Sequence, residues 1–86
     1  MAKVTIRYWA AAKEAAGVQE ESVEAVTLSD LLNTVVASRK PDRRLADVLA
    51  RSSFLVNADP VGRLARQSIV LDEDSVVEVL PPFAGG

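Results

Sequence analysis

The sequence predicts an α+β fold in which a single β-sheet is covered by one main helix. Residues 3–9 and 76–80 alternate between apolar and polar side chains, which is the period of a half-buried strand. Between them, residues 27–37 carry apolar side chains at the spacing of one helix face. A chain of 86 residues makes one small domain, so a sheet packed on one helix layer is the simplest way to bury both apolar faces.

The opening of the chain predicts a strand, a short helix and a second strand. In residues 3–9, Val4, Ile6 and Tyr8 share the apolar face, and Trp9 falls on the other face. Residues 10–16 are rich in alanine, the best helix former, and Gly17 stands where a helix-ending glycine is common. We expect a second strand at residues 19–25. A two-residue hairpin cannot join the two strands, because the helical segment lies between them.

The main helix is predicted to start at Thr27, which suits the N-cap position. Asp30, three residues later, completes a pattern that resembles a capping box, although Asp is shorter than the preferred Glu. Pro41 prevents the helix from continuing. The apolar stripe that should face the sheet consists of Leu28, Leu31, Leu32, Val35 and Val36.

The second half of the chain is predicted to supply shorter elements. Residues 61–65 fit no single pattern. The predicted elements are, in order, a short amphipathic helix within 42–51, a strand at 54–57, a turn at 57–60, a strand at 68–71, a turn at 72–74 and the last strand at 76–80.

Composition excludes several classes of protein. Ten basic and twelve acidic residues give a net charge of −2, which argues against a general nucleic-acid binder. The longest apolar run has five residues, far short of a membrane span, and no secretory signal is present, so we expect a cytoplasmic protein that does not contact membranes. The chain has no cysteine and no histidine, so the usual nucleophile, general base and metal ligands are missing. A stand-alone enzyme is therefore the weakest hypothesis.

Two charged clusters have ordinary interpretations. The acidic run at residues 72–74 lacks the ligand spacing and the glycine of a calcium loop, so we interpret it as a solvated turn and expect no metal site. Arg39, Lys40, Arg43 and Arg44 form a basic cluster that could bind a nucleotide or an acidic partner. Such clusters are more often a hydrated connection between two helices, which is the interpretation we prefer here.

The last six residues form the candidate functional segment. Pro81 and Pro82 end the preceding strand and favour an extended chain, so residues 81–86 can reach roughly 20 Å beyond a domain formed by residues 1–80. Gly85 and Gly86 have no Cβ and can pass through a narrow channel. The carboxylate of a terminal Gly86 is unhindered and could attack a nucleotide phosphate to form an acyl-adenylate, which a sulfur or nitrogen nucleophile would open.

The residues of this ending carry a family resemblance. Residues 76–86, the alanine-rich opening at 4–17 and the helix at 27–37 resemble the MoaD family, the small sulfur-carrying subunit of molybdopterin synthase. The resemblance implies a β-grasp, ubiquitin-like fold with a mixed sheet of about five strands.

The resemblance also implies a role for each part of the tail. An E1-like, ATP-using enzyme of the MoeB type would adenylate Gly86, which would then become a thiocarboxylate. The tail, through Pro81, Pro82, Phe83, Ala84 and Gly85, would enter a MoaE-type large subunit that turns cyclic pyranopterin monophosphate into the molybdopterin dithiolene. Trp9 and Leu80 match the family's docking positions, and Phe83 is an additional candidate. The chain would bind no cofactor itself and would not be catalytic on its own.

Other readings of the same tail remain open. Related carriers serve thiamine thiazole and cysteine synthesis. Thiamine carriers are usually shorter and lack the double proline, whereas a cysteine-synthesis carrier is harder to exclude. The tail could also belong to a ubiquitin-like modifier, with Gly86 destined for an isopeptide bond to lysine, or to a pure interaction module.

Overall fold

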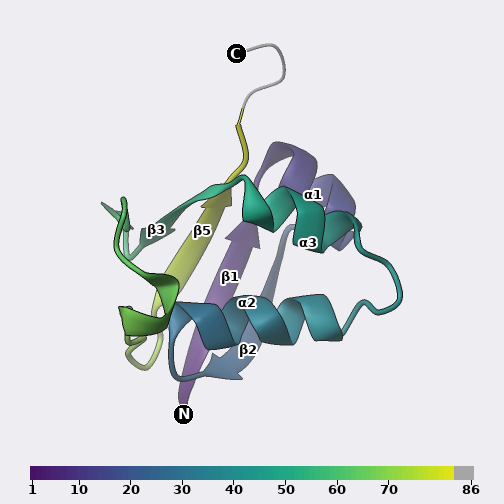
Figure 1. The fold of residues 1–86 in the computed structure, drawn as a ribbon. Coiled ribbons are helices and arrows are strands. Elements are labelled where there is room, and N and C mark those ends of the chain that lie inside the picture. The colour runs from purple at the N-terminus through teal and green to yellow at the C-terminus, as the bar shows by residue number, and fades with distance from the viewer. Residues whose placement is uncertain (83–86) are drawn as a thin grey trace.

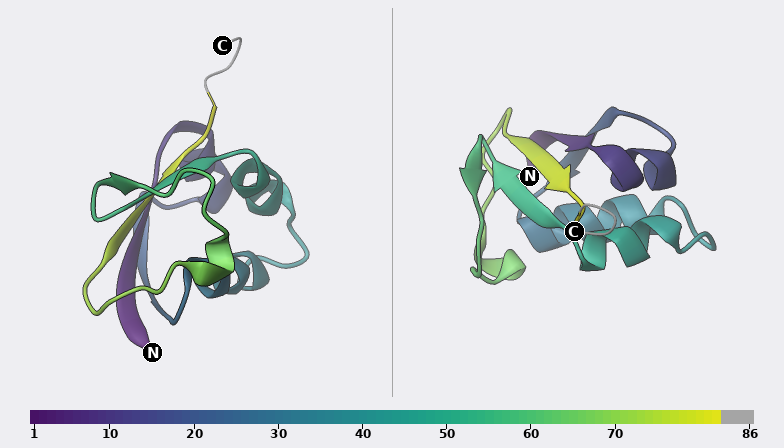
Figure 2. Two further views of the ribbon diagram at one scale, coloured as in Figure 1. Left: turned by 60° about the vertical axis from the view of Figure 1, so that its left-hand side comes forward. Right: turned by 90° about the horizontal axis from the view of Figure 1, so that it is seen from above.

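The computed structural model describes residues 1–82 and shows one five-stranded mixed sheet with helices packed on one face (Figures 1 and 2). The strand order is β2-β1-β5-β3-β4, and α2 crosses the covered face of the sheet. The elements are β1 (Ala2–Tyr8), α1 (Ala10–Ala16), β2 (Glu20–Ala25), α2 (Leu28–Ala37), α3 (Arg44–Ala50), β3 (Ser53–Val56), β4 (Asp59–Pro60), the 3₁₀ turn η1 (Arg66–Ser68) and β5 (Val76–Leu80). The predicted α+β class and mixed sheet are confirmed.

The centre of the sheet is the parallel pair β1–β5. Strand β1 pairs antiparallel with β2 on its other side, and β5 pairs antiparallel with β3. The two central strands bury alternate side chains completely, as the period-two pattern predicted. Their fully buried side chains are Val4, Ile6, Tyr8, Val77 and Val79.

The predicted start and end of the helices are largely confirmed. Gly17 ends α1 with φ 81°, a left-handed conformation that suits glycine, and its N–H donates to the Lys13 carbonyl. Thr27 caps α2 by accepting the Asp30 N–H at 3.1 Å. The Asp30 carboxylate reaches one residue further back than in a standard capping box, because it accepts the N–H of Val26 at 2.9 Å. The stripe of α2 is buried at Leu28, Leu31, Leu32 and Val35, with Val36 partly buried.

The strand predicted at 68–71 is wrong. Residues Arg66–Ser68 form a 3₁₀ turn, and Val70 makes an isolated bridge to Thr27 with 68% of its surface exposed. The segment pairs with the loop that precedes α2, because the Leu28 N–H donates to Ile69 and the Leu71 N–H donates to Val26. The apolar residues behind the strand prediction are present, but residues 68–71 pair with the loop before α2 and not with a strand of the sheet.

The fifth strand comes instead from the predicted turn at 57–60. Asp59 and Pro60 form β4, which pairs antiparallel with β3. The two residues between β3 and β4, Asn57 and Ala58, both have positive φ, at 49° and 71°. Positive φ at both central residues of a two-residue hairpin defines the I′ type of turn, in which Asn-Gly is the preferred pair.

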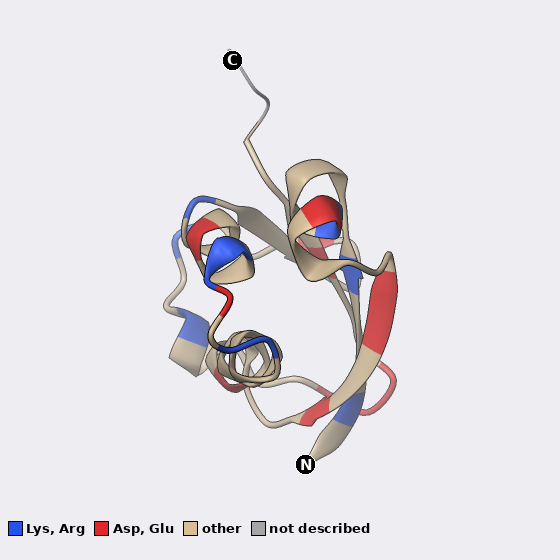
Figure 3. Ribbon diagram, turned by 90° about the vertical axis from the view of Figure 1, so that its right-hand side faces the viewer, with Lys and Arg blue, Asp and Glu red and all other residues tan. Residues whose placement is uncertain are grey.

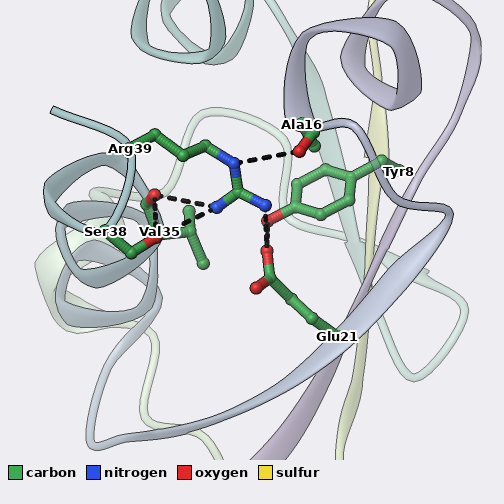
Figure 4. A network of polar contacts seen from close by, with 6 residues as sticks. All are labelled: Tyr8, Ala16, Glu21, Val35, Ser38 and Arg39. Carbon is green, nitrogen blue, oxygen red and sulfur yellow. Dashed lines mark hydrogen bonds and ion pairs between the residues drawn. The ribbon is translucent and has the colours of Figure 1, made fainter. Parts of the chain in front are cut away.

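A partly buried polar network joins the C-terminal ends of α1 and α2 to the sheet (Figure 4). Arg39 donates to Glu21 at 2.7 Å, to the Ala16 carbonyl at 3.1 Å and to the Val35 carbonyl at 2.9 Å. The Tyr8 hydroxyl donates to the same Glu21 carboxylate at 2.6 Å. Burial, and then the hydrogen bond to Glu21, raise the pKa of Tyr8 above its ordinary value, so the hydroxyl remains a proton donor. The network therefore connects β1 and β2 to the C-terminal ends of both helices.

Removing Arg39 should destabilise the protein far more than removing Arg44. Both guanidinium groups lie 2.7 Å from a carboxylate oxygen, but the Arg39–Glu21 side chains are 17% and 28% exposed, against 76% and 39% for Arg44–Asp42. We expect Arg39→Ala to lower the free energy of unfolding by about 2 kcal/mol, because it removes the cation paired with the partly buried Glu21 carboxylate and the side-chain donor to the Ala16 carbonyl. Arg44→Ala should leave it unchanged within error in urea titrations. Equal losses for the two variants would show that burial of the pair has no energetic role.

Glycine at position 58 should stabilise the β3–β4 turn. Ala58 pays for a left-handed φ that glycine adopts freely, so Ala58→Gly should raise the free energy of unfolding by about 0.5–1 kcal/mol. Ala65→Gly is the matched control, because Ala65 is exposed and has an ordinary φ of −66°. This substitution should lower the free energy of unfolding by a few tenths of a kcal/mol. Thermal or urea unfolding of both variants measures the difference, and a loss of stability at position 58 would contradict the turn geometry.

Candidate functional site

The predicted docking residues Trp9 and Leu80 lie side by side at one end of the central strand pair. Because β1 and β5 run parallel with Tyr8 opposite Val79, the residues that follow them emerge together. The Trp9 N–H donates to the Val79 carbonyl at 3.3 Å, which extends the pairing by one residue. The parallel register thus brings together two residues that are 71 positions apart in the sequence.

Trp9 lies on the face of the sheet that the helices do not cover. Its indole N–H donates to the Glu78 carboxylate at 3.1 Å, and Glu78 alternates with the buried Val77 and Val79. Trp9 is 42% exposed and Leu80 is half-buried. We call the surface formed by Trp9, Glu78 and Leu80 the Trp9 surface.

The backbone turns sharply immediately after Trp9. Ala10 has φ 49°, in the left-handed region that non-glycine residues rarely occupy. Trp9 itself is extended and precedes α1 without a side-chain cap. The chain therefore changes direction between the end of β1 at Tyr8 and the start of α1 at Ala10, and Trp9 occupies this connection. A strained backbone conformation of this kind persists when the surrounding structure fixes it, and here the strand β1 and the helix α1 lie directly on either side of the connection.

The tail begins next to the Trp9 surface. Pro81 is half-buried and Pro82 is exposed, and the yellow end of the chain in Figure 1 leaves the sheet beyond the end of β5. Leu80 is also paired with Ser53, the first residue of β3. The predicted threading residues Phe83, Ala84 and Gly85 and the predicted reactive residue Gly86 lie outside the described residues.

The acidic run at 72–74 is a turn, as predicted. Asp74 has φ 65°, its N–H donates to the Lys3 carbonyl at 2.8 Å, and the Glu73 carboxylate accepts the Lys3 N–H at 2.9 Å. Among residues 1–82, no three acidic side chains gather in a way that would hold a metal ion. Within the same part of the chain, none of the helices has the length and apolar character needed to cross a membrane.

Two neighbours of Trp9 were not identified from the sequence. Glu78 stands at an outward position of the last strand, so the period of two marks it as solvent-facing but not as the partner of a residue in β1. Val18, which is 42% exposed, lines a depression of about 830 Å³ beside Trp9 and α1. No local pattern marks Val18, because it lies in the connection between α1 and β2.

Comparisons with known proteins agree with this architecture. The sequence model of the ThiS family matches residues 6–86. The small archaeal modifier protein 1 of Methanosarcina acetivorans superposes with a TM-score of 0.83 at 22% identity, covering 100% of this chain and 98% of that one. No curated protein matches by sequence.

Two further solved structures share the fold. The complex of subunits 1 and 2 of the molybdopterin-converting factor of Helicobacter pylori contains a chain with a TM-score of 0.68 at 20% identity, with 98% of this chain and 99% of that one covered. CysO of Mycobacterium tuberculosis gives a TM-score of 0.74 at 14% identity, with 93% and 99% covered. These neighbours establish the ubiquitin-like β-grasp fold that the resemblance implied.

The family match covers all but the first five residues, and it includes the described strands that meet at the Trp9 surface together with the sequence of the tail. The chain therefore belongs to the ThiS family of ubiquitin-like sulfur carriers.

Proposed function

We propose that this chain is the sulfur-carrying subunit of a molybdopterin synthase. The observation that carries the proposal is the continuity of the family match to Gly86, together with a tail that begins beside exposed Trp9 and half-buried Leu80. A carrier needs a reactive end and an adjoining surface that a partner can hold. This arrangement supplies the surface, and the family supplies the chemistry of the end.

The proposed reaction takes place on the Gly86 carboxylate and not on a side chain. Inside an E1-like activating enzyme, a carboxylate oxygen attacks the α-phosphorus of ATP and displaces pyrophosphate. Hydrosulfide then attacks the acyl carbon of the adenylate, AMP leaves, and Gly86 becomes a thiocarboxylate. ATP is used by the partner. The absence of cysteine and histidine from this chain is compatible with the scheme, because no step requires a side-chain thiol or imidazole here.

The Trp9 surface is proposed to hold the acceptor. A chain of this fold forms a complex with subunit 2 of the molybdopterin-converting factor in Helicobacter pylori, which supports a large subunit of that kind as partner. Aromatic and aliphatic side chains at the centre of a contact supply much of its binding energy. Phe83, three residues beyond Leu80, is proposed to join the same contact.

The identity of the acceptor is what separates this proposal from its alternatives. Structural neighbours include CysO of Mycobacterium tuberculosis and a small archaeal modifier protein. All of these alternatives would begin with the same activation of Gly86. They would differ in the nucleophile that attacks the activated glycine, or in the enzyme that takes the sulfur from its thiocarboxylate. Sulfur transfer to cyclic pyranopterin monophosphate, sulfur transfer to a cysteine-synthase substrate, and an isopeptide bond to lysine are therefore the outcomes to compare.

The intact mass of the protein should report activation directly. After incubation with an E1-like enzyme, ATP and a sulfur donor, we expect a mass gain that matches one oxygen replaced by sulfur, located on Gly86 by fragmentation. One extra residue after Gly86 should abolish the gain, since the carboxylate is displaced from the reactive position, while the melting temperature stays the same. Thiocarboxylate formation by the extended chain, or none by the natural one, would rule out activation at Gly86.

Loss of the Trp9 surface should weaken binding to the large subunit. We expect Trp9→Ala and Leu80→Ala each to raise the Kd by about 10- to 100-fold, since each removes an apolar side chain from the centre of the contact. Val70→Ala is the matched control, because Val70 is 68% exposed but belongs to the segment bridged to Thr27. Titration calorimetry with a MoaE-type subunit gives the three constants, and unchanged Kd values for Trp9→Ala and Leu80→Ala would remove this surface from the proposal.

A further inference from the structure

Glu78 is the one charged residue of β5, and its carboxylate contacts the proposed docking residue Trp9. It faces away from the helices, because Val77 and Val79 on either side of it are buried against them. Its Oε2 atom accepts the Trp9 indole N–H at 3.1 Å, while Oε1 accepts no hydrogen bond from residues 1–82. The proposed function depends on the Trp9 side chain and assigns no task to this carboxylate.

The position of Trp9 is fixed at two points of the last strand. The Trp9 backbone N–H donates to the Val79 carbonyl at 3.3 Å, and the indole N–H donates to Glu78. Both acceptors belong to β5, so the ring is attached to the strand that carries the tail. A side chain that is already ordered loses less conformational freedom when a partner binds. Glu78 therefore orders Trp9 before the partner arrives.

The side chains around Glu78 on this open face are apolar. Leu55 of β3 lies opposite Glu78 in the register, and Val76 and Leu80 lie two residues away on the same face of β5. All three are half-buried, although the helices pack on the other face of the sheet (Figure 2). A carboxylate enclosed in an apolar contact loses its water, which is unfavourable unless a cation compensates its charge. The Trp9 indole supplies only one neutral hydrogen bond.

The sheet itself supplies no cation to Glu78. Among residues 1–82, the five strands contain two basic residues, Lys3 and Arg7, both in β1. Arg7 lies opposite Glu78 in the β1–β5 register, but its guanidinium group pairs with Glu20 of β2 at 3.2 Å. Lys3 lies near the other end of β1. Figure 3 shows acidic residues along β2, so the neighbouring edge of the sheet adds negative charge only.

We propose that Glu78 organises the Trp9 surface in two ways: one carboxylate oxygen holds the Trp9 indole, and the other binds a Lys or Arg side chain of the large subunit. The inference rests on the proposed function and specifies the chemistry of the partner's surface. That surface is apolar against Trp9, Leu80 and Leu55, and it carries a basic side chain opposite Glu78. Glu78 is a positioning residue, because it acts through Trp9 and through the partner and contacts no reacting atom.

Two variants of Glu78 separate the hydrogen bond from the charge. Glu78→Ala removes both, whereas Glu78→Gln keeps an oxygen that accepts the indole N–H and removes only the charge. Trp9 is the only tryptophan of the chain, so its fluorescence in the free protein reports on the indole. We expect Glu78→Ala to lower the anisotropy of Trp9 and to increase its quenching by acrylamide, and Glu78→Gln to match the natural chain. Equal values for Glu78→Ala and the natural chain overturn the positioning role.

Titration calorimetry with a MoaE-type subunit tests the cation. We expect Glu78→Gln to raise the Kd by about tenfold at low salt, with a smaller difference at high salt because salt screens the ion pair. Glu78→Ala should raise the Kd by about a further threefold, because the indole must then be ordered during binding. Glu24→Gln is the matched control, since exposed Glu24 lies opposite Lys3 near the far end of β2. Its Kd should stay within about twofold of the natural value.

Each outcome separates the inference from the function on which it rests. A natural chain that binds the large subunit, with Glu78→Gln binding equally tightly, overturns the cation and leaves the proposed function intact. Equal weakening by Glu24→Gln and Glu78→Gln also overturns it, because the net charge of the chain would then account for the effect. Absence of binding by the natural chain overturns the proposed function and the cation together. The fluorescence comparison needs no partner, so it decides independently whether Glu78 holds the indole.

Discussion

The parallel pairing of β1 with β5 is the constraint on which the rest of the structure depends. It joins the first and last strands at the centre of the sheet and buries a continuous apolar layer from both. It also decides where the functional features lie, because parallel strands end at the same edge. Trp9 after β1 and the tail after β5 are neighbours for that reason alone. An antiparallel arrangement of the same two strands would place them at opposite ends of the molecule.

The helices are held to this sheet by packing and by one polar cluster. The α2 stripe supplies much of the apolar contact. The Tyr8–Glu21–Arg39 network adds direction, since a single guanidinium group binds a carboxylate on β2 and carbonyls from α1 and α2. Glu21 accepts from both Tyr8 and Arg39, so it links the two strands β1 and β2 to the guanidinium group that binds both helices.

As a sulfur carrier, the protein has little need of catalytic side chains. In the proposed function, the reacting group is the backbone carboxylate of Gly86, and the other bond-making groups belong to the partners. In the same proposal, the domain supplies a base for the tail and an adjoining surface, the Trp9 surface, for a partner.

The sequence by itself determined the features that depend on local periodicity and on residue chemistry. It gave the α+β class, the boundaries of α1 and β5, the caps at Gly17 and Thr27, and the candidate residues Trp9 and Leu80. Residues 83–86 were assigned by sequence and by family resemblance alone.

Only the tertiary structure decided which segments pair, because pairing joins residues that are distant in the chain. The alternation at 68–71 suggested a strand, yet its partner is the loop before α2, and the short β4 arose from residues that read as a turn. The Trp9–Glu78 hydrogen bond was likewise undetectable from local patterns. A strand or helix signal records which face is apolar, whereas the neighbour that covers that face is chosen by the packing of the whole chain.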